Sequence, residues 1–172
     1  AGAFCPNSTT VTEVVCPQGS YCPEGSSLAR PCLGGSFSSS TGLQAASDCT
    51  PCPEGSACTV GATAHTHCAP GTYTANLATE SCNLCEAGKY TSTPGNTACL
   101  DCKSGYLCVE GSSAPQPCRG GTHANQTVLN VTGYLSSLDQ CVPCPAGTGC
   151  SVGSSEPAPC LPGSYAATAG SQ

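Results

Sequence analysis

The 172-residue chain contains no methionine and no tryptophan, and its aromatic residues are only two phenylalanines and six tyrosines. Large apolar side chains supply most of the free energy of a hydrophobic core, so their scarcity excludes one large core for the whole chain. No apolar run approaches the ~18 residues that a membrane-spanning helix needs. The sequence therefore predicts a string of small modules and no direct insertion into a membrane.

Charge is also scarce, above all positive charge. Four lysines and arginines stand against ten carboxylates, which gives a net charge of −6, and charged residues make up 8% of the chain. No basic patch is available for nucleic acid. Soluble surfaces usually carry about 25–35% charged residues, so another feature must keep this surface in solution. Three sequons begin at Asn7, Asn125 and Asn130, where we expect N-linked glycans; the serines and threonines of the loops are candidates for O-linked glycans.

Cysteine, in contrast, is abundant, and 15 of its 18 copies follow one spacing. The run C-x5-C-x9-C begins at Cys16, Cys52, Cys102 and Cys144, and another cysteine lies three positions earlier in the last three copies. We name the four positions of a unit a, b, c and d in chain order. This density of cysteine is typical of a disulfide framework, which persists in oxidising compartments. The sequence therefore predicts a secreted or cell-surface protein whose modules are held together by disulfides.

One irregular unit bears on how the cysteines pair. Between the second and third full units lies Cys82-Asn83-Leu84-Cys85, which has an a and a d but lacks b and c. Residues lost together are most simply bonded together, so b would join c and each d would join the next a. The competing scheme, a to c and b to d, would pair Cys82 with Cys85, and it stays open at this point. The d-to-a scheme predicts Cys16–Cys22, Cys32–Cys49, Cys52–Cys58, Cys68–Cys82, Cys85–Cys99, Cys102–Cys108, Cys118–Cys141 and Cys144–Cys150.

The spacing also predicts the local structure. Glycine lies three positions after every b and every c, where a seven-residue loop must turn. After d come signatures such as GGSF and PGTY, which predict a short strand entering a hairpin, and no segment has extended helical periodicity. We expect a small disulfide-rich fold: an elongated tandem array of cysteine-rich modules with short β-hairpins and little helix. The expected modules are 1–48 with an atypical N-terminal loop, 49–81, the truncated 82–98, 99–140 with a long glycosylated loop, and 141–172, open at its C-terminal end.

An elongated array would be visible in solution scattering. A compact globule of this length would have a radius of gyration near ~16 Å. Small-angle X-ray scattering of the isolated chain should therefore give a clearly larger value, and a result near that of the globule would contradict the expectation.

The pattern C-x-x-C-P-x-G-x-x-C followed by P-C-x-x-G-[ST]-[YF] resembles the ephrin-receptor-like cysteine-rich repeat. That family is related in style to epidermal-growth-factor-like and tumour-necrosis-factor-receptor modules. The resemblance covers nearly the whole chain; the departures are the truncated unit at Cys82–Cys85 and the ten-residue gap between Cys5 and Cys16. It implies extracellular spacers, receptor stalks, adhesion proteins and surface coats, and it implies no catalysis.

Some of the same residues allow other interpretations. The CxxC pairs that begin at Cys49 and Cys82 have the spacing of a zinc ribbon, but other cysteines lie between them and the compartment is oxidising. His65 and His67 could share a metal on one strand face, although a polar loop that happens to hold two histidines is the simpler interpretation. No hydroxyl nucleophile can be matched to a base, and His123 stands where other units have Tyr or Phe. We predict no catalytic, cofactor or metal site, and no enzyme.

Two functions suit this scaffold. One is an extracellular structural glycoprotein, a rod-like repeat unit of a surface fibre, filament or coat. The other is an adhesion or receptor ectodomain module that binds a protein or glycan partner. Scarce charge and scarce aromatics favour the first, since binding surfaces are rich in Tyr, Trp and Arg.

The fibre hypothesis includes a specific joint between copies. The d-to-a scheme leaves Cys5 and Cys160 without a partner. If a second copy followed Gln172, sixteen residues would separate Cys160 from the Cys5 of that copy, the same span as between Cys32 and Cys49. We therefore expect copies of the chain to join head to tail, by a peptide bond or by an inter-subunit Cys160–Cys5 disulfide, because a contact that does not close generates a filament.

Overall fold

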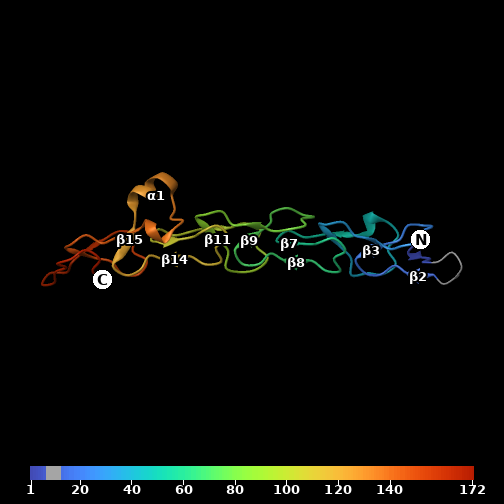
Figure 1. Ribbon diagram of the computed structural model, residues 1–172, viewed down its shortest axis with the longest axis horizontal. Coiled ribbons are helices and arrows are strands. Elements are labelled where there is room, and N and C mark those ends of the chain that lie inside the picture. Colours follow the sequence, from blue (N-terminus) through green and yellow to red (C-terminus); the bar gives the residue numbers. More distant parts are fainter. Residues whose placement is uncertain (7–12) are drawn as a thin grey trace. The chain divides into compact units, whose positions relative to one another are not determined.

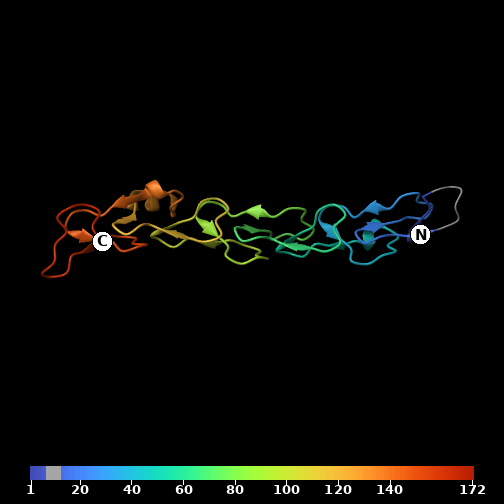
Figure 2. The same cartoon turned by 60° about the horizontal axis from the view of Figure 1, so that its bottom comes forward.

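The computed structural model describes residues 1–6 and 13–172, and short strands joined by turns and irregular stretches make up most of it (Figures 1 and 2). Each sheet has two strands that are consecutive in the chain. The strands are β1 (Ala3–Phe4), β2 (Val14–Val15), β3 (Ser20–Tyr21), β4 (Arg30–Pro31), β5 (Ser36–Phe37), β6 (Thr50–Pro51), β7 (Ser56–Ala57), β8 (Thr66–His67), β9 (Thr72–Tyr73), β10 (Asn83–Leu84), β11 (Lys89–Tyr90), β12 (Leu100–Asp101), β13 (Tyr106–Leu107), β14 (Gln116–Pro117), β15 (Thr122–Ala124), β16 (Cys141–Pro143), β17 (Thr148–Gly149) and β18 (Ala158–Pro159).

The expected fold class is confirmed: the chain is a small disulfide-rich protein with many short antiparallel hairpins and little helix. Its contacts form two compact units. Unit 1 comprises Ala1–Ala69, Tyr73–Asn83 and Pro94–Ala98, and unit 2 comprises Pro70–Thr72, Leu84–Thr93 and Cys99–Gln172. This division is coarser than the five modules expected from the sequence, whose boundaries stay a prediction.

Most hairpins are formed by a short sequence pattern: a cysteine, a turn glycine three residues later, and two strands that are both edge strands. In the hairpin β3–β4, Cys16 is followed three residues later by Gly19, whose φ is 71°, a backbone conformation that strains residues with a Cβ. β4 ends in Pro31, which has no N–H to donate. Both strands of a two-stranded sheet are edges, so the proline is tolerated there. Isolated hairpins of this size are marginally stable in water, and other contacts must hold them.

A repeating set of backbone hydrogen bonds supplies some of those contacts. The N–H of Cys32, which follows β4, donates to the carbonyl oxygen of Gly19 at 2.8 Å. The N–H of Gly61 in turn donates to the carbonyl oxygen of Cys32 at 2.8 Å, and the N–H of Gly19 donates to Ser38 at 2.9 Å. The hairpin β3–β4 is thereby bonded to the next hairpin, β5–β6, and to the loop of the one after it, β7–β8. We call this arrangement the hairpin ladder.

The same ladder recurs in unit 2. There the N–H of Cys118 donates to Gly105 at 2.9 Å, and the N–H of Gly153 donates to Cys118 at 2.8 Å. A Cβ atom added to Gly105 would lie 2.1 Å from the carbonyl oxygen of Gly153. The turn glycine is therefore required for the stacking of the loop as well as for the turn itself.

The buried side chains are mostly cysteines. Among the described residues, the buried hydrophobic side chains other than cysteine are those of Leu107, Ala124 and Leu135. These three gather around Cys118 in unit 2, with Val128 and other partly buried residues packed against them. Disulfide sulfur thus takes the place of most of the apolar core that the composition lacks.

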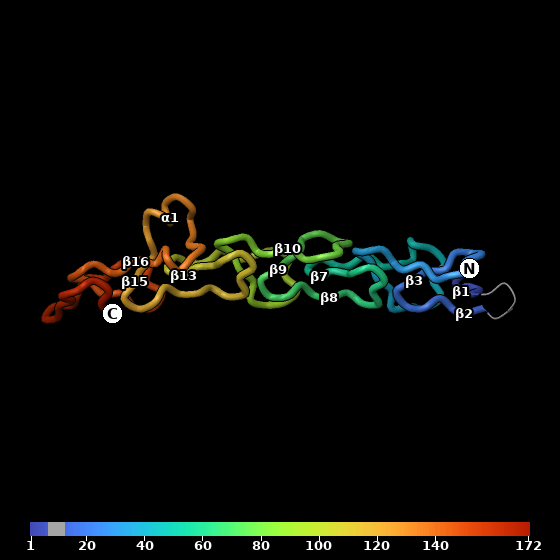
Figure 3. The backbone as a smooth tube through the Cα atoms, in the orientation of Figure 1, coloured from blue at the N-terminus to red at the C-terminus, as the bar shows by residue number. Residues whose placement is uncertain are grey.

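Residues 119–140, for which the sequence predicted a loop, contain a short helix. The helix α1 (Gln126–Thr132) projects beside the hairpins of unit 2 (Figure 3). Asn125 Oδ1 accepts hydrogen bonds from the N–H groups of Thr127 and Val128, and Gly133, with a φ of 80°, ends the helix. A helix of seven residues is too short for a periodic pattern to reveal, and its two caps and the contact of Val128 with the Leu107 cluster stabilise it instead.

Two short 3-10 helices lie just before cysteines of the a position: η1 (Ala46–Asp48) and η2 (Leu138–Gln140). One Asp48 carboxylate oxygen accepts hydrogen bonds from the N–H groups of Gln44 and Ala45, both at 2.9 Å. These bonds favour the charged carboxylate, with that of Ala45 the larger cause, and they lower the pKa of Asp48 below its ordinary value.

The lowered pKa of Asp48 predicts a local acid transition. The carboxylate stabilises η1 at any pH above the pKa of an unfolded aspartate, and this contribution is lost as the pH falls through the lower folded pKa. The amide resonances of Gln44 and Ala45 should therefore shift with a common midpoint below that of an ordinary aspartate, as measured by NMR titration. Asp48→Asn, whose amide oxygen can still accept hydrogen bonds, should abolish the transition; its persistence in this variant would contradict the assignment.

Candidate functional site

The disulfides are the chemistry that the chain displays most plainly. The structure joins the cysteines as Cys16–Cys22, Cys32–Cys49, Cys52–Cys58, Cys68–Cys82, Cys85–Cys99, Cys102–Cys108, Cys118–Cys141 and Cys144–Cys150. These are the eight pairs of the d-to-a scheme, with Cα–Cα separations from 5.7 to 6.2 Å that suit a disulfide. Each bond between b and c encloses the tight turn before a hairpin and its first strand, as Cys16–Cys22 encloses β3, whereas a bond between d and a also encloses the connection to the second strand, as Cys32–Cys49 encloses β5 and the loop that leads to β6.

Cys5 and Cys160 are free in the structure, Cys5 exposed and Cys160 half-buried. Cys5 follows β1, and its N–H donates to the carbonyl oxygen of Ser26 at 3.1 Å, as the N–H of Ser38, which follows β5, donates to that of Ala62 at 3.1 Å. Cys160 follows β18 as Cys32 follows β4, which is the d position. A Cys160–Cys5 bond would therefore join a d to a position that a serine holds in the hairpin β5–β6.

The residues of the two metal interpretations have other contacts. Cys49 and Cys82, which begin the two CxxC pairs, are both in disulfides and supply no thiolate. His67 Nδ1 lies 3.0 Å from the buried Ser56 Oγ, and the ring of His65 packs edge-on against His67 with centroids 5.2 Å apart. Within the described residues, no group of three or more histidines, cysteines or carboxylates is placed to hold a metal ion.

Two of the three sequons lie on described residues. Asn125 is the half-buried N-cap of α1, and Asn130 is exposed within the helix. A sugar attaches to the side-chain nitrogen, so a glycan on Asn125 leaves the capping oxygen free to accept its two hydrogen bonds. Asn7 lies outside the described residues.

Glycan attachment is directly testable. We expect sugars at Asn125 and Asn130, and also at Asn7, because exposed loop insertions tolerate bulk and the surface has little charge. Glycopeptide mass spectrometry of the native protein should detect them, and Asn130→Gln should lose one glycan mass while Asn76→Gln, at an asparagine outside any sequon, loses none. Three bare sequons would contradict the idea that sugars replace surface charge.

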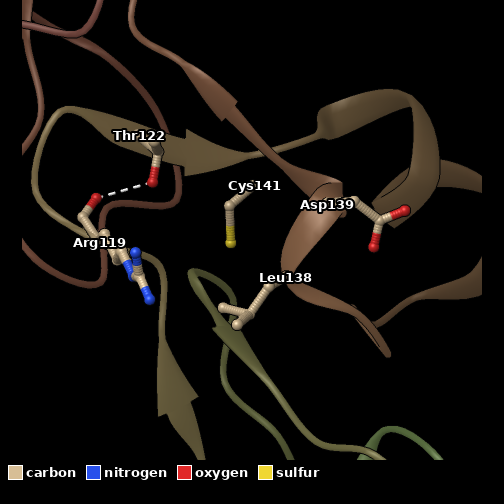
Figure 4. A pocket seen from close by; sticks show the side chains of 5 residues that line it. All are labelled: Arg119, Thr122, Leu138, Asp139 and Cys141. Carbon is tan, nitrogen blue, oxygen red and sulfur yellow. Dashed lines mark hydrogen bonds between the residues drawn. The ribbon is translucent and has the colours of Figure 1, made fainter.

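A small pocket of about 280 Å³ lies beside the d-to-a bridge of the long insertion (Figure 4). The side chain of Arg119 extends into it toward Leu138, whereas Asp139 points away from Arg119 (Figure 4). Thr122 Oγ1 donates to the carbonyl oxygen of Arg119 at 2.7 Å and holds the turn that carries the arginine. The pocket contains one cationic side chain, that of Arg119, next to the apolar side chain of Leu138. These groups are too few to define a ligand.

A larger pocket of about 550 Å³ lies between β11–β12 and the segment that follows α1, all within unit 2. Its lining includes Glu86, Lys89 and Asp101 on one side and Thr132 and Tyr134 on the other. The sequence pattern did not single out these residues. The available signal was indirect: the pocket lies between the hairpin after the truncated unit and the longest d-to-a loop, both of which are irregular features of the repeat.

The comparisons with known proteins give no match, either to a protein family or to a curated protein. The class of protein therefore comes from the chain itself: a tandem cysteine-rich repeat protein whose eight disulfides indicate an extracellular or secreted location. In the part of the chain that the structure describes, no helix has both the length and the apolar character to cross a bilayer.

Proposed function

We propose that this chain is a structural glycoprotein of the extracellular space that forms part of a fibre, filament or coat, with copies joined head to tail. The observation that carries the proposal is the hairpin ladder. Most of the described turn glycines receive a loop from the hairpin two places further along, as Gly19 receives the loop of Gly61 and Gly105 that of Gly153. Such a contact repeats without closing on itself, which is the geometry that generates filaments.

The ladder also supplies a surface for the joint. A Cβ added to Gly147 or to Gly163 would meet no described atom within 4 Å, although both glycines have the positive φ of the turn glycines that receive a loop. Gly25 is on the other side of such a contact. It holds the same position as Gly61 and Gly153, whose loops seat on turn glycines, and a Cβ added to Gly25 would also meet no described atom within 4 Å. The proposed joint seats the Gly25 loop of one copy on Gly163 of another. The proposal does not depend on the Cys160–Cys5 disulfide, which stays a hypothesis.

Assembly of the oxidised chain tests the proposal. Electron microscopy and sedimentation velocity should find oligomers that lengthen with protein concentration. Gly163→Ala should suppress them, because its Cβ would enter the joint. Gly133→Ala is the matched control, since Gly133 has a similar φ of 80° and open space around its Cα. Monomers at every concentration, or oligomers unchanged by Gly163→Ala, would refute the head-to-tail joint.

The disulfide hypothesis needs a separate measurement. Non-reducing electrophoresis with peptide mapping should show a peptide that contains Cys5 bonded to one that contains Cys160 from another copy. A Cys5–Cys160 bond within one monomer, or two free thiols in assembled material, would end that form of the joint.

The alternative function, an adhesion or receptor module that binds a protein or glycan partner, is favoured by one observation, the pocket beside Tyr134.

A further inference from the structure

The pocket beside Tyr134 concentrates features that are scarce elsewhere in the chain. Charged residues make up 8% of the sequence, yet Glu86, Lys89 and Asp101 all line this one pocket. Tyr134 adds one of only six tyrosines. Charge and aromatic character gathered in a single hollow favour a binding site over an unspecialised surface.

One wall of the pocket is the hairpin β11–β12. Lys89 and Asp101 are register partners on its two strands, so their side chains start from directly opposite positions. The turn is closed by a hydrogen bond of 3.0 Å from the N–H of Lys89 to the carbonyl oxygen of Glu86. Two carboxylates and one ammonium group are therefore carried by this one short hairpin and the turn before it, next to the disulfide Cys85–Cys99.

The other wall is the aromatic ring of Tyr134. At other turn glycines of the ladder, such as Gly19 and Gly105, the carbonyl oxygen of a loop packs on the glycine. At Gly88 the ring of Tyr134 takes the place of that carbonyl, and a Cβ added to Gly88 would lie 2.3 Å from the ring carbon Cγ. The backbone around the tyrosine is held on both sides. Gly133 donates to Leu129 at 2.8 Å, and the next residue, Leu135, is fully buried.

From this arrangement we infer that the pocket binds a neutral sugar, as a hexose or N-acetylhexosamine residue of a glycan. Carboxylate oxygens of Glu86 and Asp101 accept hydrogen bonds from sugar hydroxyls, and the ammonium of Lys89 donates to them. The half-exposed ring of Tyr134 offers an apolar face with a polar edge, which suits the alternating CH and OH surface of a sugar. Because the backbone on both sides of the ring is already held, the chain loses little conformational entropy when a ligand binds.

Other ligand classes fit the same residues less well. An anion would meet two carboxylates against one ammonium group, and a purely apolar ligand would leave all three charges to be desolvated. A divalent cation would be repelled by Lys89, which faces Asp101 across the hairpin. A cationic side chain is the strongest competitor, and the experiment includes it.

A source of sugar lies close by in the sequence. Asn130, an exposed sequon residue, is in the same helix as Thr132, which lines the pocket. The inference does not rest on the fibre proposal, because a free glycan, a glycan of another molecule or one on a second copy would present the same chemistry.

The test uses the full oxidised chain after enzymatic removal of its N-glycans. N,N′-diacetylchitobiose and methyl α-mannoside are titrated separately at millimolar concentrations, and two-dimensional NMR follows the amides of Gly88, Lys89 and Asp101. We expect saturable shifts at these amides with at least one of the two sugars. Tyr134→Ala and Asp101→Asn should each weaken binding by about tenfold or more, the loss typical of a central contact residue.

Matched variants separate binding from folding. Tyr165→Ala removes a tyrosine that is 88% exposed and remote in sequence from the pocket, and it should bind as the parent does. Gly88→Ala should displace the ring and abolish binding, whereas Gly163→Ala, with a φ of 86° against 87° at Gly88 but with open space around it, should retain binding. Dispersed amide spectra verify that each variant is folded.

Three results would overturn the inference. One is the absence of saturable shifts with both sugars in the folded parent chain. Another is binding that is unchanged in Tyr134→Ala and Asp101→Asn. The third is a lysine-containing peptide that shifts the same amides while neither sugar does, which would assign the pocket to a cationic ligand.

Discussion

Full reduction of the disulfides should unfold the protein at 25 °C. Among the described residues, Leu107, Ala124 and Leu135 are the only buried hydrophobic side chains that are not cysteines, so little apolar burial remains once the bridges are open. Each loop that a disulfide closes contributes about 2–3.5 kcal/mol in the chain-entropy model, and small domains have only about 5–15 kcal/mol of net stability. NMR amide dispersion should collapse on reduction, with thiol content measured in parallel.

Individual disulfides should differ in how much each contributes to the free energy of unfolding, and the longer loop should contribute more. The Cys118–Cys141 bridge joins residues 23 apart and Cys118 is in the Leu107 cluster, whereas the Cys102–Cys108 bridge joins residues only 6 apart. Replacing both cysteines of the first pair by serine should cost about 3 kcal/mol or more of the free energy of unfolding, and replacing the second pair about 2 kcal/mol.

For the first of these two predictions, full reduction, a fully reduced chain that keeps native amide dispersion would contradict the proposed dependence on disulfides.

Gly105→Ala should destabilise unit 2 much more than Gly147→Ala. The two glycines hold the same position in their hairpins, three residues after b, and their φ angles are 82° and 83°. Both variants therefore have the same cost of a left-handed alanine, about 1–2 kcal/mol. At Gly105 the new Cβ would also lie 2.1 Å from the carbonyl oxygen of Gly153, whereas at Gly147 it meets no described atom within 4 Å.

The difference between these variants measures the stacking contact of the ladder. Forced overpacking typically costs about 1–3 kcal/mol, so Gly105→Ala should be less stable than Gly147→Ala by about that amount in denaturant unfolding at low protein concentration. Hydrogen exchange should also quicken at Gly153, whose N–H bonds to Cys118. Equal stability of the two variants would show that the turn glycine is needed for its φ alone.

The sequence by itself determined the repeat and the class of fold, and it favoured the d-to-a pairing of the cysteines. These follow from local rules. A cysteine followed three residues later by glycine specifies a tight turn, and the deletion of b and c together in the unit of Cys82 and Cys85 indicates which positions belong together. The strand expected at the signature GGSF is present as β5, directly after the turn glycine Gly35 and within the loop that Cys32–Cys49 closes.

Only the tertiary structure decided what depends on residues far apart in the chain. The ladder seats the loop of Gly61 on Gly19, a contact between residues 42 positions apart that no spacing rule anticipates. α1 lacks a visible period, and it forms because Asn125 and Gly133 cap it and because Leu107, from another hairpin, is part of the cluster on which it packs. The pocket beside Tyr134 exists because the hairpin β11–β12 and the long insertion meet within unit 2, and chain order does not encode that meeting.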